Sequence, residues 1–368
     1  MSDFASVLAA IAVLALLIVV HELGHFLAAR LQGIHVNRFS IGFGPVLWKY
    51  QGRRTEYALR AFPLGGFVGF PDDDPDSPIP PNDPNLLRNR PILDRAIVIS
   101  AGVLANLLFA YLVFVVQFST VGIPETFDFQ PGVVVPRITS QEAPAAQAGI
   151  RAGDVIIAVD GQPLGSAEPA IRSLMDTIRA KPNQPVELQV QRGTQQLEID
   201  VIPKVGEDGT ARIGVELAPN GSIAGYRRPE NLAEVFTLAA EQFQSMFVRT
   251  VQGFVSLITN FSSVANQVAG PVKIVEQGAG LVSSNANSLF PFAAIISINL
   301  AIINILPLPA LDGGQLAFLL IEGLRGKPLP SRFQENVMQT GLVLLLGLGI
   351  FLIVRDTTQL EVFQRLFQ

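Results

Sequence analysis

The sequence predicts an α-helical polytopic membrane protein with about four transmembrane helices, a membrane-associated β-hairpin and an inserted α/β domain. Three observations support this fold class. Of the 368 residues, 49% are hydrophobic and only 15% are charged, and the mean hydropathy is +0.39, which is unlike a soluble domain. Several apolar runs are long enough to span a membrane. Between them, residues 130–218 have ordinary polarity and regular Gly and Asp turn signals.

Composition also excludes several classes of function. The formal net charge of −5 is small and argues against nucleic-acid binding. The chain has no cysteine, so a disulfide, a thiolate metal site and a Cys nucleophile are all impossible. Because there are only 3 His residues, a metal site would need a carboxylate ligand as well.

The first predicted transmembrane helix, residues 1–30, carries an H-E-x-x-H motif formed by His21, Glu22 and His25. No basic residue precedes the apolar run, so we expect a retained span rather than a signal peptide. On a helix, His21 and His25 face the same way and can bind one metal ion. Glu22 can take a proton from a metal-bound water. The alternative is a polar face packed against other spans without a metal; ionisable groups inside an apolar span favour a functional site.

Residues 31–70 lack helical character and predict a membrane-associated β segment beside the motif. Strand-type residues alternate here between turn-forming glycines. Irregular backbone at membrane depth is tolerated when it is buried in protein or faces a water-filled cavity. His35 begins this segment, and we expect a surface or interfacial histidine rather than a metal ligand.

Residues 71–95 are rich in Pro and Asp and predict a flexible cytoplasmic loop, because such a composition cannot build a core. Residues 96–119 form the second predicted transmembrane helix.

Residues 130–218 resemble a PDZ domain. A helix-turn glycine, Gly149, leads to Gly153 and Asp154, and a strand and an Asp-Gly turn follow. Gly214 falls in a segment similar to the carboxylate-binding loop, as in bacterial circularly permuted PDZ domains, so it is a candidate substrate-binding residue. The resemblance implies capture of a peptide C-terminus by strand addition. The alternative is a PDZ-shaped plug that gates access and binds no peptide.

The remaining chain predicts an amphipathic helical region at 229–287 and two further spans, at 288–323 and 336–355. Two prolines and two glycines flank Asp312 and predict a broken helix inside the third span; such breaks occur at membrane depth where they line a site.

Lys and Arg cluster between the first and second spans and before the last one, so both segments should be cytoplasmic. The H-E-x-x-H motif then lies toward the cytoplasmic side of the membrane and the PDZ-like domain is extracytoplasmic. This orientation brings the histidine pair and Asp312 to one depth.

Three motifs together resemble the site-2 protease family of intramembrane metalloproteases. They are the H-E-x-x-H at His21, the second-span Gly102-x-x-x-Asn106, and the stretch from Asn304 to Gly313 that contains Asp312. The single PDZ-like region resembles the bacterial branch of regulator-of-sigma proteases, which cleave anti-sigma factors and signal-peptide remnants.

The resemblance implies a zinc ion held by His21, His25 and Asp312, with Glu22 as general base. Three protein ligands and a water are the layout of a catalytic zinc site. It also implies that Asn304 holds the substrate backbone near the metal; a helix cap beside Pro307 is an equally good interpretation of this residue.

The predicted activity is cleavage of single-span transmembrane proteins within the lipid bilayer, in regulated intramembrane proteolysis. A helix is a poor protease substrate because its carbonyls are already bonded internally. We therefore expect the edge of the 31–70 segment to pair with an unwound part of the substrate. The alternatives are a non-catalytic membrane scaffold that binds C-termini through its PDZ-like domain, and a metal transporter. An intact Glu22 argues against the scaffold, and nearly uncharged second and last spans argue against the transporter.

Overall fold

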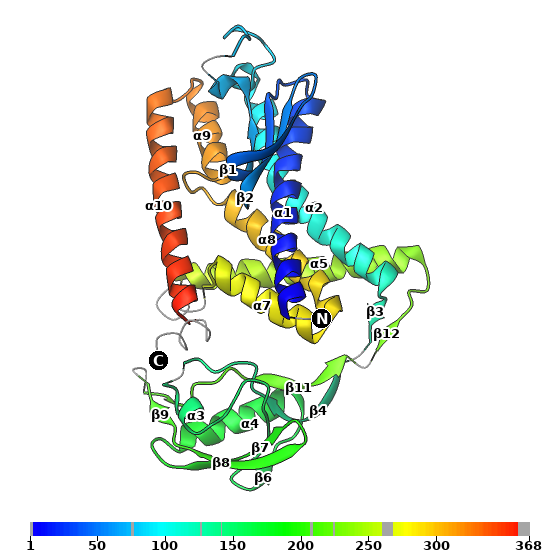
Figure 1. Cartoon of the computed structure of the whole chain (residues 1–368), viewed down its shortest axis with the longest axis vertical. Coiled ribbons are helices and arrows are strands. Elements are labelled where there is room, and N and C mark those ends of the chain that lie inside the picture. Colours follow the sequence, from blue (N-terminus) through cyan, green and yellow to red (C-terminus); the bar gives the residue numbers. More distant parts are fainter. Residues whose placement is uncertain are drawn as a thin grey trace. The chain divides into compact units, whose positions relative to one another are not determined.

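Four long apolar helices dominate one part of the computed structural model: α1 (Asp3–Leu31), α2 (Ile92–Thr120), α8 (Leu289–Ile305) and α10 (Ser331–Gln359) (Figure 1). The structure describes residues 3–74, 77–125, 127–140, 142–206, 209–223, 225–259 and 268–359. Within these residues, 4 helical segments are long and apolar enough to cross a membrane. This agrees with the predicted helical membrane protein, whereas the exact number of spans stays a prediction.

The chain divides into two compact units. The helical unit consists of Met1–Val121 and Pro229–Gln368, and the other unit of Gly122–Arg228. The second unit is thus inserted into the first, and each is described by itself below.

Small residues let α1, α2 and α8 pack closely in the helical unit. A Cβ on Gly24 of α1 would overlap the backbone of Ala101 on α2. The Ser297 hydroxyl of α8 donates to the Asn106 carbonyl oxygen of α2 at 2.8 Å. Close backbone approach and interhelical hydrogen bonds are the usual means of association for helices in lipid.

The predicted third span is interrupted as expected, and it forms two helices. The first, α8, ends at Ile305, and the second, α9 (Asp312–Arg325), begins at Asp312. Ala310 has a φ of 70° in the connecting turn. A Cβ on Gly313 would overlap the carbonyl oxygens of Ile305 and Leu306, so this turn requires glycine. The break therefore places Asp312 at the first position of a new helix.

Two long, bent strands, β1 (Arg38–Gln51) and β2 (Glu56–Gly69), follow α1. They pair in parallel where residues 38–41 meet 56–59, and they also fold back so that Gln51 pairs with Glu56 and Val46 with Arg60. Ala58 therefore has partners on both sides, Ser40 and Lys49, and is interior. Residues 66–69 pair only with residues 38–41. The predicted β segment is present with an edge at 66–69; its association with a membrane stays a prediction.

The aromatic side chains of this sheet pack on α1. The ring centroids of Phe26 on α1 and Phe39 on β1 are 5.2 Å apart, and those of Phe26 and Tyr57 on β2 are 6.1 Å apart. Edge-on aromatic contacts of this kind fix the sheet against the helix that carries the H-E-x-x-H motif.

The acidic Pro-rich segment is anchored at several points. It contains two short 3-10 helices, η1 (Pro71–Asp73) and η2 (Leu87–Asn89). The Asp72 carboxylate accepts the Leu87 N–H at 2.9 Å, and the Asn85 carbonyl accepts the His35 N–H at 3.0 Å. Residues 75 and 76 lie outside the described residues, and the predicted flexibility of the loop stays a prediction. His35 itself lies 3.6 Å from the Asp83 carboxylate.

The predicted amphipathic region contains α5 (Leu232–Thr259) and α7 (Pro271–Ser284), followed by a short 3-10 helix, η4 (Ala286–Ser288). In Figure 1 both α5 and α7 run across the long apolar helices rather than alongside them. The end of α10 holds the start of α7, because the buried Asp356 carboxylate accepts the Lys273 N–H at 3.2 Å. Arg355 beside it donates to the Val268 carbonyl.

The inserted unit is an α/β domain built on a sheet of strand order β11-β4-β5-β7-β8, with β6 beside β5. Its strands are β3 (Ile123–Pro124), β4 (Phe127–Val134), β5 (Val155–Val159), β6 (Gln162–Pro163), β7 (Val186–Arg192), β8 (Gln195–Val201), β9 (Lys204–Val205), β10 (Ala211–Arg212), β11 (Ala218–Ile223) and β12 (Tyr226–Arg227). Its helices are α3 (Pro144–Gln147) and α4 (Ala167–Ala180). One face of α4 buries Ala170, Leu174 and Ile178 in the core. The strand β11 lies at one edge of this sheet.

A buried ion pair holds the Gly-Asp turn of this unit. The Asp154 carboxylate, 1% exposed, accepts two hydrogen bonds of 2.7 Å from Arg192 on β7. It also accepts the Arg151 N–H at 2.8 Å. Burial raises the pKa of the Asp154 carboxyl, and these hydrogen bonds lower it. The lowering outweighs the effect of burial, so the pKa lies below its ordinary value. The ionised form therefore stabilises the fold.

We expect Asp154→Asn to lower the free energy of unfolding of the inserted unit by about 2 kcal/mol at pH 7, because a charge-assisted pair is lost. Because the pKa of Asp154 is lower in the folded than in the unfolded chain, its ionised carboxylate stabilises the fold fully above the unfolded pKa of about 3.9. This stabilisation is lost as the pH falls through the folded pKa. The difference between the two proteins should therefore shrink at pH 3. Pulsed hydrogen exchange of β5 and β7 in urea, on the full chain, measures both. Equal urea midpoints at pH 7 would contradict this assignment.

Candidate metal centre

Three electron-pair donors from two segments that lie far apart in the sequence of the helical unit converge on one point. His21 and His25 lie one turn apart on α1, with their Nε2 atoms 3.2 Å apart. The Oδ2 atom of Asp312, at the start of α9, lies 3.2 Å from His21 Nε2 and 3.4 Å from His25 Nε2. Among the described residues, this is the only group of three or more His, Asp or Glu side chains with ligand atoms within 4.8 Å of one another.

The spacing of these atoms fits a tetrahedral zinc ion. Ligands at about 2.0–2.1 Å from such an ion lie about 3.3 Å from one another. Asp312 Oδ2 is buried without a hydrogen-bond partner in the described part of the chain. Converging lone pairs of a carboxylate and two neutral imidazoles repel unless a cation lies between them. The donor set can therefore hold a zinc ion with a fourth position left open.

Contacts behind the histidines set the orientation of the rings. His25 Nδ1 lies 2.8 Å from the Val98 carbonyl oxygen on α2, so Nδ1 carries the proton and Nε2 keeps its lone pair. His21 Nδ1 lies 3.2 Å from the amide of Asn106, which is fully buried and whose Oδ1 has no partner among the described residues. Turning this amide by 180° lets Oδ1 accept the His21 Nδ1–H and leaves His21 with the same tautomer.

Gly102 gives the two imidazoles their space. A Cβ at this position would overlap His25 Nε2 and would lie 2.7 Å from His21 Cε1. Any larger residue on this face of α2 would push the rings apart. The second-span Gly102-x-x-x-Asn106 motif therefore supplies both the room for the histidine pair and a partner for one of its members.

Glu22 stands beside the converging donors rather than among them. A Cβ on Gly66 would lie 2.9 Å from Glu22 Cγ, and the Val68 backbone N–H donates to the Glu22 carboxylate. Glu22 thus lies between the histidine pair and the free edge of β2. This position suits a proton carrier next to a metal-bound water better than a fourth ligand.

Of the two expected substrate-binding residues, one lies at this site. The amide of Asn304, near the end of α8, is 3.4 Å from His21 Nε2. Gly214 belongs to the inserted unit, where its φ is 77° and its carbonyl accepts the Thr139 N–H at 3.0 Å. A Cβ there would lie 2.6 Å from that of Ala143, so local packing already requires this glycine.

Gly102 and Asn106 form a motif in the sequence of the second span, but the motif by itself assigns no role to either residue. A polar amide inside an apolar span was the available signal for Asn106. The sequence cannot single out the Val98 carbonyl, because every residue has a backbone carbonyl.

Residues 9–348 match the model described as peptidase family M50. The chain belongs to this family. It is therefore a zinc-dependent metalloprotease of the site-2 protease family, as the motifs predicted, and its apolar helices make it a membrane protein.

Relatives in the M50 family are similar over nearly the whole chain. A Nostoc sp. (strain PCC 7120) protein named "Putative zinc metalloprotease all3971" is 63% identical over 99% of this chain and 100% of its own. "Membrane metalloprotease ARASP, chloroplastic" of Arabidopsis thaliana is 50% identical over 98% of this chain and 80% of its own. "Protease RseP" of Yersinia pestis is 32% identical over 95% and 98%, respectively.

Solved PDZ domains are similar to about a quarter of the chain. That of the SdrC-like protein of Listeria monocytogenes is 26% identical, covering 25% of this chain and 92% of the domain, with a TM-score of 0.22. The PDZ-like character is assigned from the strand and helix pattern of the unit itself.

We expect Asn106→Leu to weaken zinc binding about 10- to 100-fold while the chain stays folded, because His21 loses the partner that fixes its tautomer. Competition with a chelator measures the affinity. Gln117→Leu is the matched control, since Gln117 is a second buried amide on α2. Equal zinc affinities of the two variants would contradict a role of Asn106 in orienting His21.

Proposed function

We propose that this chain is an intramembrane metalloprotease that cleaves single-span membrane proteins within the bilayer, with zinc held by His21, His25 and Asp312. The observation that carries the proposal is the 3.2–3.4 Å triangle of Nε2 and Oδ2 atoms. His21 and His25 lie on α1, and its segment Phe4–Leu31 is long and apolar enough to span a membrane. A hydrolytic site on such a helix is suited to substrates that lie in the membrane.

Glu22 moves the proton in the proposed reaction. When bound, the zinc would polarise the scissile carbonyl and make the attacking water more acidic. Glu22 takes a proton from that water and then delivers it to the leaving amine nitrogen, so that one carboxylate serves both halves of the hydrolysis. Its place between the histidines and the 66–69 edge lets it reach both the water and the cleaved bond.

Asn304 holds the substrate next to the zinc in this proposal. Its side-chain amide carries both a donor and an acceptor, which suits a peptide backbone. The distance of 3.4 Å to His21 Nε2 supports this role over a helix cap. The end of α8 is capped without it, since the Leu306 N–H donates to the Ile303 carbonyl.

The free edge of β2 receives the unwound substrate. Strand addition supplies backbone hydrogen bonds to a segment that has left its helix, which repays part of the cost of unwinding. Residues 66–69 have no partner strand on their outer side in the described sheet, and they border Glu22. The interior position of Ala58 excludes that part of β2 from such pairing.

The proposed topology places the zinc toward the cytoplasmic side of a bacterial inner membrane and the PDZ-like unit on the other side. The cluster of Lys and Arg between the first two spans supports it. Anti-sigma factors or signal-peptide remnants are the proposed substrates, in regulated intramembrane proteolysis. A substrate C-terminus would add to the edge strand of the PDZ-like unit near Gly214.

We expect Glu22→Gln to lower the cleavage rate of a single-span substrate in liposomes about 10²- to 10⁴-fold, because the general base is lost. Zinc content should not change, since Glu22 is outside the donor triangle. Glu335→Gln, at an exposed position of α10, is the control. Cleavage by Glu22→Gln at the rate of the control would exclude Glu22 as the base and favour a non-catalytic scaffold.

Strand addition is testable by cysteine cross-linking, because the chain has no native cysteine. Phe67→Cys in the Glu22→Gln background should form disulfides with substrate cysteines spaced two residues apart, the period of a strand. Tyr50→Cys, on the opposite edge of the sheet, should not. A spacing of three to four residues would mean that the substrate binds as a helix, contrary to this proposal.

A further inference from the structure

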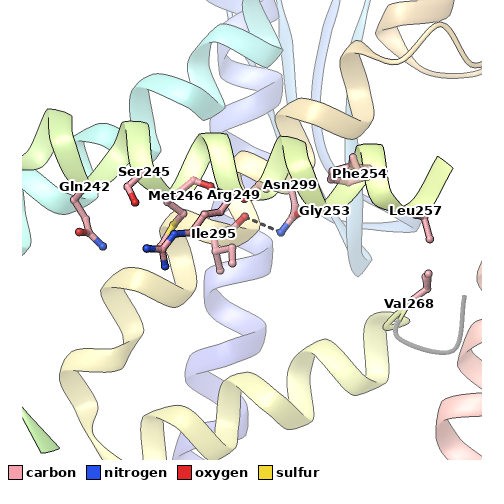
Figure 2. A pocket seen from close by; sticks show the side chains of 11 residues that line it. Gln242, Ser245, Met246, Arg249, Gly253, Phe254, Leu257, Val268, Ile295 and Asn299 are labelled. Atoms are coloured by element: carbon pink, nitrogen blue, oxygen red, sulfur yellow. Dashed lines mark hydrogen bonds between the residues drawn. The ribbon is translucent and has the colours of Figure 1, made fainter. Parts of the chain in front are cut away.

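A cavity of about 470 Å³ lies between α5 and α8, and nothing in the proteolytic mechanism uses it. Figure 2 shows its lining, which comes mainly from α5, with Ile295 and Asn299 from α8 and Val268 from the residues before α7. Its volume is within the usual range for small-molecule sites.

The lining is apolar along one part and polar along another. Met246, Phe254, Leu257 and Ile295 supply apolar surface. Among the polar groups, the Thr250 hydroxyl donates to the Met246 carbonyl at 2.8 Å. The Asn299 amide donates to the Ile295 carbonyl at 3.0 Å, as Figure 2 shows. Both groups are therefore engaged within their own helices. Arg249 extends its guanidinium from the lining and makes no such bond to another described residue.

Arg249 has no acidic partner in the described part of the chain. Other arginines of the helical unit are paired, such as Arg95 with Glu322 on α9 and Arg355 with Asp356. On α5 itself, Glu241 precedes Arg249 by eight residues, about 12 Å along the helix axis. A guanidinium that lies beside apolar surface and has no carboxylate within 4.0 Å among the described residues is suited to an external anion.

The setting of the cavity indicates which anion. Ile295 and Asn299 lie within Ala286–Ile305, a helical segment long and apolar enough to span a membrane. On α5, the exposed Val255 and Ile258 flank the lining residues. An amphipathic helix of this kind is suited to the boundary of headgroups and acyl chains, where phosphate groups and hydrocarbon are adjacent.

We propose that this cavity binds an anionic glycerophospholipid, with its phosphate on Arg249 and an acyl chain along Met246, Phe254 and Leu257. Leu257 follows Arg249 by eight residues, or about 12 Å, so one molecule can place a headgroup at one end and hydrocarbon at the other. Free phosphate satisfies only the guanidinium. A zwitterionic lipid carries its own cation, which competes with Arg249 for the phosphate.

The test is native mass spectrometry of the purified full chain with phosphatidylglycerol, phosphatidylcholine or inorganic phosphate. We expect phosphatidylglycerol to bind more tightly than phosphatidylcholine and inorganic phosphate not to displace it. Arg249→Gln should weaken phosphatidylglycerol binding about tenfold, the value of one charge-assisted hydrogen bond. Arg332→Gln, at an exposed position of α10, should bind like the wild type.

A second variant separates the contribution of the cavity to lipid binding from that of the Arg249 charge. A Cβ on Gly253 would meet nothing within 4 Å, so Gly253→Leu can fill the cavity without disturbing α5. It keeps Arg249 and should still lose the lipid. Equal binding by wild type, Arg249→Gln and Gly253→Leu would overturn the proposal. So would displacement by inorganic phosphate, or a photoreactive group at Met246 that labels a substrate but not phosphatidylglycerol.

Discussion

The structure depends on bringing three electron-pair donors together inside a framework of apolar helices. A carboxylate and two imidazoles are costly to place at such depth, and their converging lone pairs repel one another. Only a cation among them repays this cost. The 3.2–3.4 Å spacing of His21, His25 and Asp312 is therefore the feature from which the rest of the helical unit can be understood.

Each departure from regular helix packing serves this convergence. The break after Ile305 ends one helix and starts another, so that Asp312 stands at a helix start where a carboxylate is stabilised by the helix dipole. Gly313 permits the tight turn, and Gly102 leaves room for the imidazoles on the opposite side. The Val98 carbonyl and the Asn106 amide then fix the orientation of the His25 and His21 rings. The site is thus held by α1, α2, α8 and α9 together.

Much of this could be predicted from the sequence because local patterns carry it. The H-E-x-x-H spacing places two imidazoles on one helix face, and the Pro and Gly residues around Asp312 predict a broken helix. Other features depend on how distant segments meet. Residues 31–70 are predicted as a β segment, but which part of β2 is an edge depends on the folding back of two bent strands. The anchoring of the acidic segment through Asp72 and Asn85, and the cavity at Arg249, likewise arise only from tertiary contacts.

X-ray absorption at the zinc edge reports whether His21, His25 and Asp312 bind the same ion. For the purified wild-type chain, we expect one zinc ion with two imidazole ligands and additional oxygen ligands at about 2.0–2.2 Å. Asp312→Ala should weaken zinc binding and, where zinc remains, remove one oxygen ligand from the spectrum. A zinc ion without imidazole scattering, or a spectrum and affinity that Asp312→Ala leaves unchanged, would contradict a shared site.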